Sequence, residues 1–233
     1  GYQTPTNSSP LFAINHDGTE VEGFPLIVGE RIKAGVALAD LDGNGKDDIV
    51  FGSDADYLHV ILDNLSEAPG FPIDLGNNLR SEPAVLDIGS EKIILIGSND
   101  NNFYAINYSD VSIRFVVPTG DDVYTSAAFK GSGNNTEIYF GSDDGNIFGI
   151  DVNGNALPGF PYNINGAVIG SIAIADLNND SFLDIVAVNS LGQLYGLDDS
   201  GMLLDNFPIN HQHPFASAPM IIDLDNDGDL EIF

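Results

Sequence analysis

The chain has 233 residues, enough for one large all-β domain with a sizeable core. It has no cysteine, which excludes a disulfide scaffold, and no apolar run near the length of about 18 residues that spans a bilayer. Its 35 Asp and Glu residues against 7 Lys and Arg give a formal net charge of −28, which excludes nucleic acid as a partner through repulsion.

This composition predicts a globular protein without membrane insertion. Residues 1–9 are predicted to be an N-terminal tail and residues 10–233 a single domain. The chain begins at Gly1 without a charged and apolar leader, so we expect a mature or excised fragment. Self-repulsion among so many acids destabilises a compact state unless cations relieve it, which makes the acids candidates for metal ligands.

A dipeptide ending in proline recurs along the chain at intervals of 43 to 47 residues. Between two such dipeptides the pattern predicts four strands, the third with an aromatic residue near its centre and the fourth ending at the next dipeptide. Four strands per repeat are typical of a propeller blade. The five dipeptides are Phe24-Pro25, Phe71-Pro72, Val117-Pro118, Phe160-Pro161 and Phe207-Pro208.

The first two strands of each repeat are apolar runs separated by a polar loop. Turn dipeptides at 17–18, 153–154 and 200–201 end in glycine and predict the hairpins between third and fourth strands. The predicted first strands are Val36 to Ala39, Ala84 to Leu86, Ala127 to Phe129, Ile172 to Ala175 and Met220 to Ile222. The predicted second strands include Asp48 to Phe51, Ile93 to Ile96, Glu137 to Phe140 and Asp184 to Ala187.

The two ends of the chain each supply half a repeat. Residues 11–25 match third and fourth strands, whereas residues 208–233 match first and second strands. We therefore predict an all-β fold, a five-bladed β-propeller of four-stranded blades whose ring is closed by the N- and C-terminal strands in one blade. Such closure leaves no unpaired sheet edge. The alternative is an open piece of a ring of six to eight blades.

Three of the five loops between first and second strands carry acidic or amide residues at loop positions 1, 3, 5 and 9. The residue at position 7 varies, as expected if its backbone carbonyl is the ligand. The first loop offers Asp40, Asp42, Asn44, Lys46 and Asp48. The second offers Asp176, Asn178, Asp180, Phe182 and Asp184, and the third Asp223, Asp225, Asp227, Asp229 and Glu231.

Alternating oxygen ligands on a tightly turned loop suit calcium, which takes about six to eight oxygens. An EF-hand is excluded because that loop needs a glutamate at position 12, where Phe51 and Ala187 stand here, and a helix on each side. The corresponding loops at 86–91 and 130–135 lack the pattern. The sequence therefore predicts three Ca²⁺ sites, against the plainer reading of metal-free turns.

The segments 39–50, 175–186 and 222–232, which read ADLDGNGKDDIV, ADLNNDSFLDIV and IDLDNDGDLEI, resemble the FG-GAP and VCBS repeats of integrin α-subunits and of secreted bacterial proteins. The resemblance extends from about residue 10 to 233. It implies structural calcium sites on the face opposite the usual ligand surface, and an adhesion or glycan-binding module. Integrin rings have seven blades, so the predicted five differ from that part of the family.

Few other residues indicate chemistry. His211 and His213 are interpreted as loop residues, and His59 as a packing residue at the aromatic position of a third strand. No nucleophile motif or phosphate-binding loop is found, and we predict no catalytic residue. The candidate ligand surface consists of Arg31, Lys33, Arg80 and Tyr124, residues before or at first strands where repeats diverge; solvated charges are the alternative.

We therefore expect a secreted or cell-surface binding or adhesion module, stabilised by calcium, which recognises a glycan or an extracellular protein and is not an enzyme. A monomer is favoured. The alternatives are a propeller-type polysaccharide lyase or hydrolase-associated domain, implied by related repeats, and a purely structural spacer.

Overall fold

The structure is a computed structural model that describes residues 8–211 and 213–233, so most of the predicted tail lies outside the described residues. Within these ranges the elements are β-strands and one short 3-10 helix, η1 (Gly133–Asn135). None of the described helical structure is long and apolar enough to cross a membrane. The predicted all-β class is confirmed.

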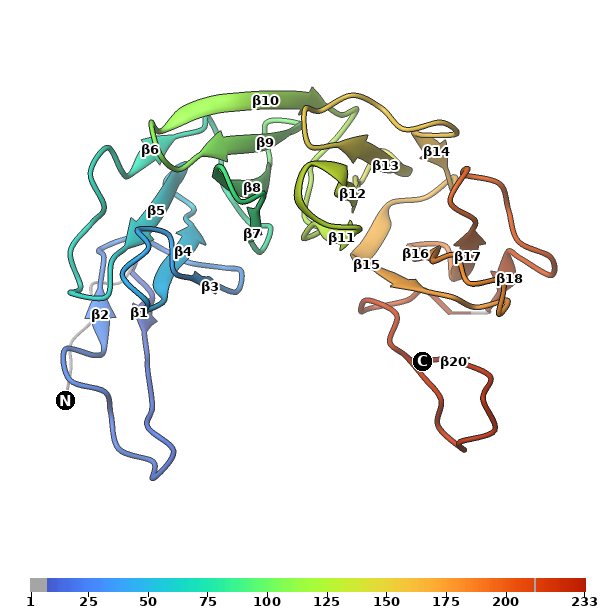
Figure 1. Cartoon of the computed structure of the whole chain (residues 1–233), viewed down its shortest axis with the longest axis horizontal. Coiled ribbons are helices and arrows are strands. Elements are labelled where there is room, and N and C mark those ends of the chain that lie inside the picture. Colours follow the sequence, from blue (N-terminus) through green and yellow to red (C-terminus); the bar gives the residue numbers. More distant parts are fainter. Residues whose placement is uncertain (1–7, 212) are drawn as a thin grey trace.

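Four antiparallel sheets of four strands follow one another, with a two-stranded hairpin at each end. Within each sheet the strands are neighbours in sequence order, which gives a simple meander. The sheets lie side by side along an arc, with their first strands on the concave side and their fourth strands on the convex side (Figure 1). The predicted four-stranded repeat is confirmed.

The strands have the following bounds. The N-terminal hairpin is β1 (Pro10–Leu11) and β2 (Leu26–Ile27), and the C-terminal hairpin is β19 (Ile221–Ile222) and β20 (Glu231–Ile232). The first sheet is β3 (Ala37–Ala39), β4 (Asp48–Gly52), β5 (Tyr57–Ile61) and β6 (Ile73–Asp74), and the second is β7 (Ala84–Asp87), β8 (Lys92–Ser98), β9 (Asn102–Asn107) and β10 (Ser112–Pro118). The third is β11 (Ala128–Lys130), β12 (Glu137–Gly141), β13 (Asn146–Asp151) and β14 (Tyr162–Asn163), and the fourth is β15 (Val168–Ala175), β16 (Asp184–Asn189), β17 (Gln193–Leu197) and β18 (Ile209–Asn210).

The fourth strands correct one prediction. Only β10 ends on its dipeptide, at Pro118, whereas β2, β6, β14 and β18 begin just after a Phe-Pro pair. Single bridges such as Ile61 with Glu67 pair the chain before the dipeptide as well. Proline has no N–H to donate, so it interrupts the ladder and divides these fourth strands into two pieces.

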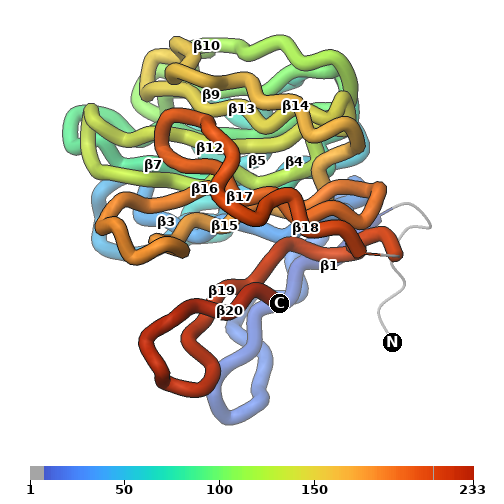
Figure 2. Tube along the Cα trace, turned by 90° about the vertical axis from the view of Figure 1, so that its right-hand side faces the viewer, coloured from blue at the N-terminus to red at the C-terminus, as the bar shows by residue number. Residues whose placement is uncertain are grey.

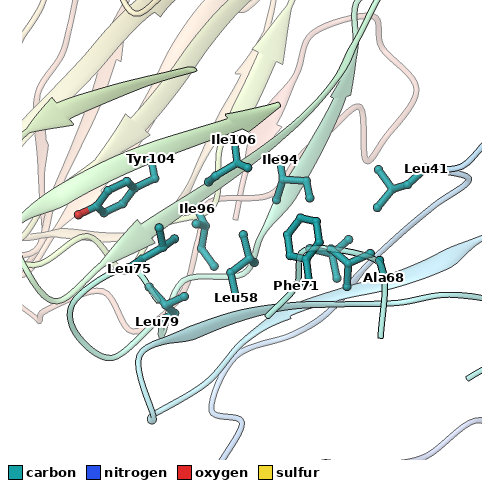
Figure 3. Close-up of a cluster of buried hydrophobic side chains, with 12 residues drawn as sticks. Leu41, Leu58, Ala68, Phe71, Leu75, Leu79, Ile94, Ile96, Tyr104 and Ile106 are labelled. Carbon is teal, nitrogen blue, oxygen red and sulfur yellow. The ribbon is translucent and has the colours of Figure 1, made fainter. Parts of the chain in front are cut away.

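The cores lie between neighbouring sheets. Successive residues of β8 point to opposite faces, so that Ile94 and Ile96 pack toward the first sheet and Ile93 and Leu95 toward the third. Figure 3 shows the first of these cores, where Leu58 from β5 meets Ile94 and Ile96. A sheet buried on both faces requires a continuous apolar run instead of an alternating one, and the second strands have such runs.

The two terminal hairpins lie at the two ends of the arc, across its opening (Figure 1). Both project from the same side of the four sheets (Figure 2). They form separate two-stranded sheets, and among the described residues no pairing joins β1 or β2 to β19 or β20. The structure therefore shows the two predicted half-blades but not the predicted closure.

His59 joins the segment after the N-terminal hairpin to the first sheet. It is buried in β5 and stacks on Phe51, with ring centroids 4.8 Å apart. Its Nδ1 lies 3.0 Å from Glu67 Oε2 and its Nε2 lies 3.1 Å from Glu30 Oε2. Burial alone would lower the pKa of His59, but the hydrogen bonds to Glu67 and Glu30 outweigh it and raise the pKa above its ordinary value.

The stability of the fold should therefore depend on pH through His59. Because the folded-state pKa is raised, the contribution is fully present below the unfolded pKa of about 6.5 and is lost as pH rises through the folded value. Urea unfolding in excess calcium, at pH values from about 6.5 upward, should show that the free energy of unfolding of the parent protein falls as pH rises. His59→Phe, which copies the ring at Phe148, should remove this slope; parallel pH curves for both proteins would contradict the assignment.

Candidate functional site

The three acidic loops connect a first strand to a second strand. In each loop, position 9 is the first residue of the second strand and pairs with the end of the first strand: Ala39 with Asp48, Ala175 with Asp184 and Ile222 with Glu231. The carboxylate at position 9 is therefore fixed by the sheet ladder, while the earlier positions turn above it.

The same hydrogen bonds recur in all three loops. The position 9 carboxylate accepts the backbone N–H of position 2, from Leu41 at 3.0 Å, Leu177 at 2.8 Å and Leu224 at 2.8 Å. The position 1 carboxylate accepts the N–H of position 6, from Gly45, Ser181 and Gly228 at 2.9 to 3.2 Å. Because each bond holds a side-chain oxygen toward the inside of the turn, the loops share one geometry as well as one spacing.

The backbone of these loops turns through left-handed conformations at positions 4 and 6. Position 6 has φ of 86° at Gly45, 75° at Ser181 and 97° at Gly228. Position 4 holds Gly or Asn, residues that adopt positive φ at least cost. With these two turns, the carboxylates at positions 1, 3 and 9 of the first and third loops converge.

Two groups of acids converge closely enough to hold a metal ion. Carboxylate oxygens of Asp40, Asp42 and Asp48 lie within 4.8 Å of one another, and so do those of Asp223, Asp225 and Glu231. In the middle loop position 3 is an amide, Asn178, and the position 5 acid Asp180 does not form such a group with Asp176 and Asp184 within the described residues. These clusters contain the position 1, 3 and 9 residues that the spacing predicts.

Two buried oxygens in these loops lack a hydrogen-bond partner within the described residues, Asp184 Oδ1 and Asp223 Oδ1. Asp184 is 1% exposed, and its burial, with smaller contributions from Asp180 and Asp176, raises the pKa of its carboxyl. An unpaired buried carboxylate oxygen is costly unless a donor or a cation satisfies it. The residues present therefore fit a cation that prefers hard oxygen ligands.

Asp63 contacts the first loop and was not predicted from the sequence. Its backbone N–H donates to Asp48 Oδ1 at 3.1 Å, and its carboxylate accepts Asn44 Nδ2 at 3.1 Å and Lys46 Nζ at 2.6 Å. Asp63 comes from the turn after β5, outside the loop, so loop spacing carries no signal for it. Its N–H explains why Asp48 has both oxygens satisfied while Asp184 does not.

The two sheets without an acidic loop have a lysine at the same edge. Lys92 starts β8 and donates to the carbonyl oxygen of Asp40 in the neighbouring sheet. Lys130 ends β11, with its Nζ 3.6 Å from Glu137 Oε2 and 3.9 Å from Asp199 Oδ2 of the next sheet. Covalently attached ammonium groups thus supply positive charge where the ligand pattern is absent.

The structure brings together only part of the predicted ligand surface. Arg31 and Arg80 both approach Asp54 and line one pocket. Tyr124 donates to Asp122 at 2.7 Å, and its hydroxyl also interacts with Arg80. Lys33 is exposed and does not line the pocket. His211 and His213 are exposed loop residues, as predicted, with the ring of His211 against Phe215.

Several solved structures are similar to this fold. The computationally designed protein Ika8 matches with a TM-score of 0.59 at 15% identity, over 93% of this chain and 62% of that one. BBS1N, crystallised in complex with ARL6DN, matches at 0.55 and 11% identity, over 95% and 62%. BamB from Moraxella catarrhalis matches at 0.56 and 17% identity, over 82% and 55%. The chain thus spans less than two thirds of each of these chains.

No protein-family model matches the sequence, and no curated protein matches it either. At these low identities the structural matches show the fold alone. The protein is therefore an all-β protein of repeated four-stranded antiparallel sheets, and the arrangement of these sheets is propeller-like. The resemblance to FG-GAP and VCBS repeats stays a prediction.

Proposed function

We propose that the chain is a calcium-stabilised, non-catalytic binding or adhesion module that works outside the cell. The observation that carries the proposal is the repeated loop geometry with unpaired carboxylate oxygens at Asp184 and Asp223. Extracellular calcium is abundant enough to fill even weak loops, and an ion bound only by the folded state stabilises that state. Bound Ca²⁺ would supply the positive charge at each site, and the loop residues orient the oxygens that would hold it.

Three Ca²⁺ ions should bind per chain, held by positions 1, 3, 5 and 9 and by the carbonyl of position 7. Asp184→Asn removes one charged ligand oxygen, so calorimetric titration should count two tight sites in place of three. The control Asp87→Asn changes an acid in a loop without the pattern and should leave three. Unchanged stoichiometry in Asp184→Asn would contradict the assignment of the middle loop.

Removing calcium should lower the melting temperature. At a hundredfold excess over Kd each site contributes about 2.7 kcal/mol, which is about 5 to 11 °C for a chain of this length. Scanning calorimetry with and without a chelator measures the shift. Identical melting curves would contradict calcium stabilisation.

The binding function itself is tested by a glycan array and an array of extracellular proteins, each with and without calcium. A module stabilised by calcium should bind specific partners only when the ion is present. Silence in both conditions, on both arrays, would favour a structural spacer instead.

A polysaccharide lyase is the second candidate, because a pocket of about 440 Å³ beside the first acidic loop is lined by Asp42, Lys92 and Tyr108. A base next to a bound ion is the arrangement that such an enzyme needs. Burial, followed by the charges of Asp48 and Asp42, raises the pKa of Tyr108, and the Lys92 ammonium already donates to a carbonyl. These two facts favour the non-catalytic function.

We extend the proposal to ring closure, in which the two terminal hairpins would supply complementary halves of a fifth blade. Phe12 and Ile14 are 62% and 56% exposed, whereas the matching Phe148 and Ile150 of the third sheet are 9% and 2% exposed. Ile222 and Phe233 at the other end are exposed as well. Closure would bury these four apolar side chains.

The fourth sheet also has a pocket in which the turn of the N-terminal hairpin would pack if the ring is closed. At other junctions a turn residue of the next blade packs on the bend before a Phe-Pro pair, Leu65 on Gly23 and Val111 on Gly70. The matching bend at Asn206 borders a pocket of about 500 Å³ lined by Leu177, Leu203 and Phe207. By this repeat, the turn at Gly18 would fill it.

The alternative is an arc of a ring of six to eight blades, favoured by the opening in Figure 1 and by the fraction of Ika8 that the chain spans.

In a closed blade Ile14 would lie opposite Ile232. The equivalent residues of two other sheets form such pairs, Ile49 with Ile61 and Ile185 with Leu197.

Ile14→Cys with Ile232→Cys introduces the only thiols, since the chain has no cysteine. Mild oxidation should form a disulfide within one chain, seen by non-reducing electrophoresis and loss of free thiol. The control pair Ile14→Cys with Ile113→Cys, with the second thiol on β10, should not react. Free thiols in both pairs, or disulfides only between chains, would contradict closure and favour the larger ring.

A further inference from the structure

A polar pocket of about 480 Å³ lies at the opposite end of the first sheet from the first acidic loop. That loop ends at Asp48, where β4 begins, whereas Asp54 follows the other end of β4. The backbone N–H of Asp54 donates to the carbonyl of Arg31 at 2.8 Å, which holds the segment after the N-terminal hairpin against this end. The lining residues are Gly29, Glu30, Arg31, Asp54, Ala55, Asn78 and Arg80.

Two of the seven Lys and Arg residues of this acidic chain line the pocket. Arg80 Nε lies 2.7 Å from Asp54 Oδ1, and Arg31 Nη1 lies 4.0 Å from Asp54 Oδ2. One carboxylate thus lies between two guanidinium groups. Arg80 makes this contact through Nε and also interacts with the Tyr124 hydroxyl, whereas Arg31 lies at the outer limit of an ion pair, so the N–H donors of Arg31 above all remain for a ligand.

The charges around the pocket balance, although the whole chain has a formal net charge of −28. The other acid of the lining, Glu30, contacts His59 Nε2 at 3.1 Å, and His59 contacts Glu67 through its other nitrogen. A protonated ring donates to both carboxylates, so its one positive charge is shared between Glu30 and Glu67. With Glu67 counted, the positive charges of Arg31, Arg80 and His59 equal the carboxylates of Asp54, Glu30 and Glu67 in number, and the side chain of Arg31 is 51% exposed and accessible.

The lining also restricts the kind of ligand. It offers donors on two arginines and Asn78, acceptors on Asp54 and Glu30, and no large apolar or aromatic side chain. A peptide with apolar side chains would find nothing to pack against. A sugar acid has one carboxylate for a guanidinium and several ring hydroxyls that both donate and accept.

We propose that the pocket between Arg31, Asp54 and Arg80 binds a uronic acid residue of an acidic glycan. The carboxylate of the sugar lies against the guanidinium groups, and its hydroxyls pair with Asp54, Asn78 and Glu30. The proposal rests on the binding function proposed above, and it names the ligand class.

The test is titration of the calcium-saturated chain with trigalacturonate, followed by NMR or calorimetry, beside galactotriose, which has no carboxylate. Trigalacturonate should bind and galactotriose should not. Arg31→Gln and Arg80→Gln should each weaken binding at least about tenfold, because each removes a charge-assisted contact. Lys33→Gln removes an exposed cation outside the pocket and should change the affinity less than about twofold.

A further variant is expected to act in the opposite direction. Asp54→Asn keeps the size of the side chain and removes the carboxylate that competes for the arginines, so trigalacturonate should bind more tightly. Equal affinity for the neutral sugar, or parent-like affinity in both arginine variants, would overturn the proposal. Equal binding of triglutamate would overturn the sugar assignment. If an array identifies another ligand while trigalacturonate fails, the binding function stands and this ligand class does not.

Discussion

Repulsion between carboxylates that the backbone holds close together is the constraint on which the structure depends. The sheet ladder fixes Asp48, Asp184 and Glu231 at the start of a second strand, and backbone N–H groups hold further acids against them. Water and N–H donors relieve such charge in part, but a divalent ion relieves it directly and ties the turn to the ladder. Three bound ions would bring the formal charge from −28 to −22.

The two ends of the second strands differ in the residues that they carry. The end where second strands begin carries acids or lysines, which join one sheet to the next, as Lys92 does with Asp40. The other end carries the segments that differ between repeats, with Arg31 and Arg80 around Asp54. Under the proposed function, a ligand surface at the second end can therefore vary without disturbing the calcium-binding loops proposed for the first end, since the buried strands between them remain the same.

Much of the fold was predictable because its signals are local and repeated. The period of the proline dipeptides gave the sheets, and the spacing within loops gave the acids that converge around Asp48 and Glu231. Contacts between distant segments carry no such signal: Asp63 at the first loop and Glu30 at His59 were not predicted. The division of the fourth strands at Phe-Pro was not predicted either. The repeat marked the dipeptide as the end of the strand, whereas strand pairing continues after the proline. Curvature of the arc depends on packing between sheets, which local sequence does not specify.

The most direct measurement of the central claim is anomalous scattering from a crystal of the chain grown with calcium. The account predicts three peaks of anomalous density, one within each loop at 40–48, 176–184 and 223–231, surrounded by oxygens at about 2.3 to 2.6 Å. The unpaired oxygens of Asp184 and Asp223 should be among the ligands. Crystals saturated with calcium that show no density in these loops would contradict the account.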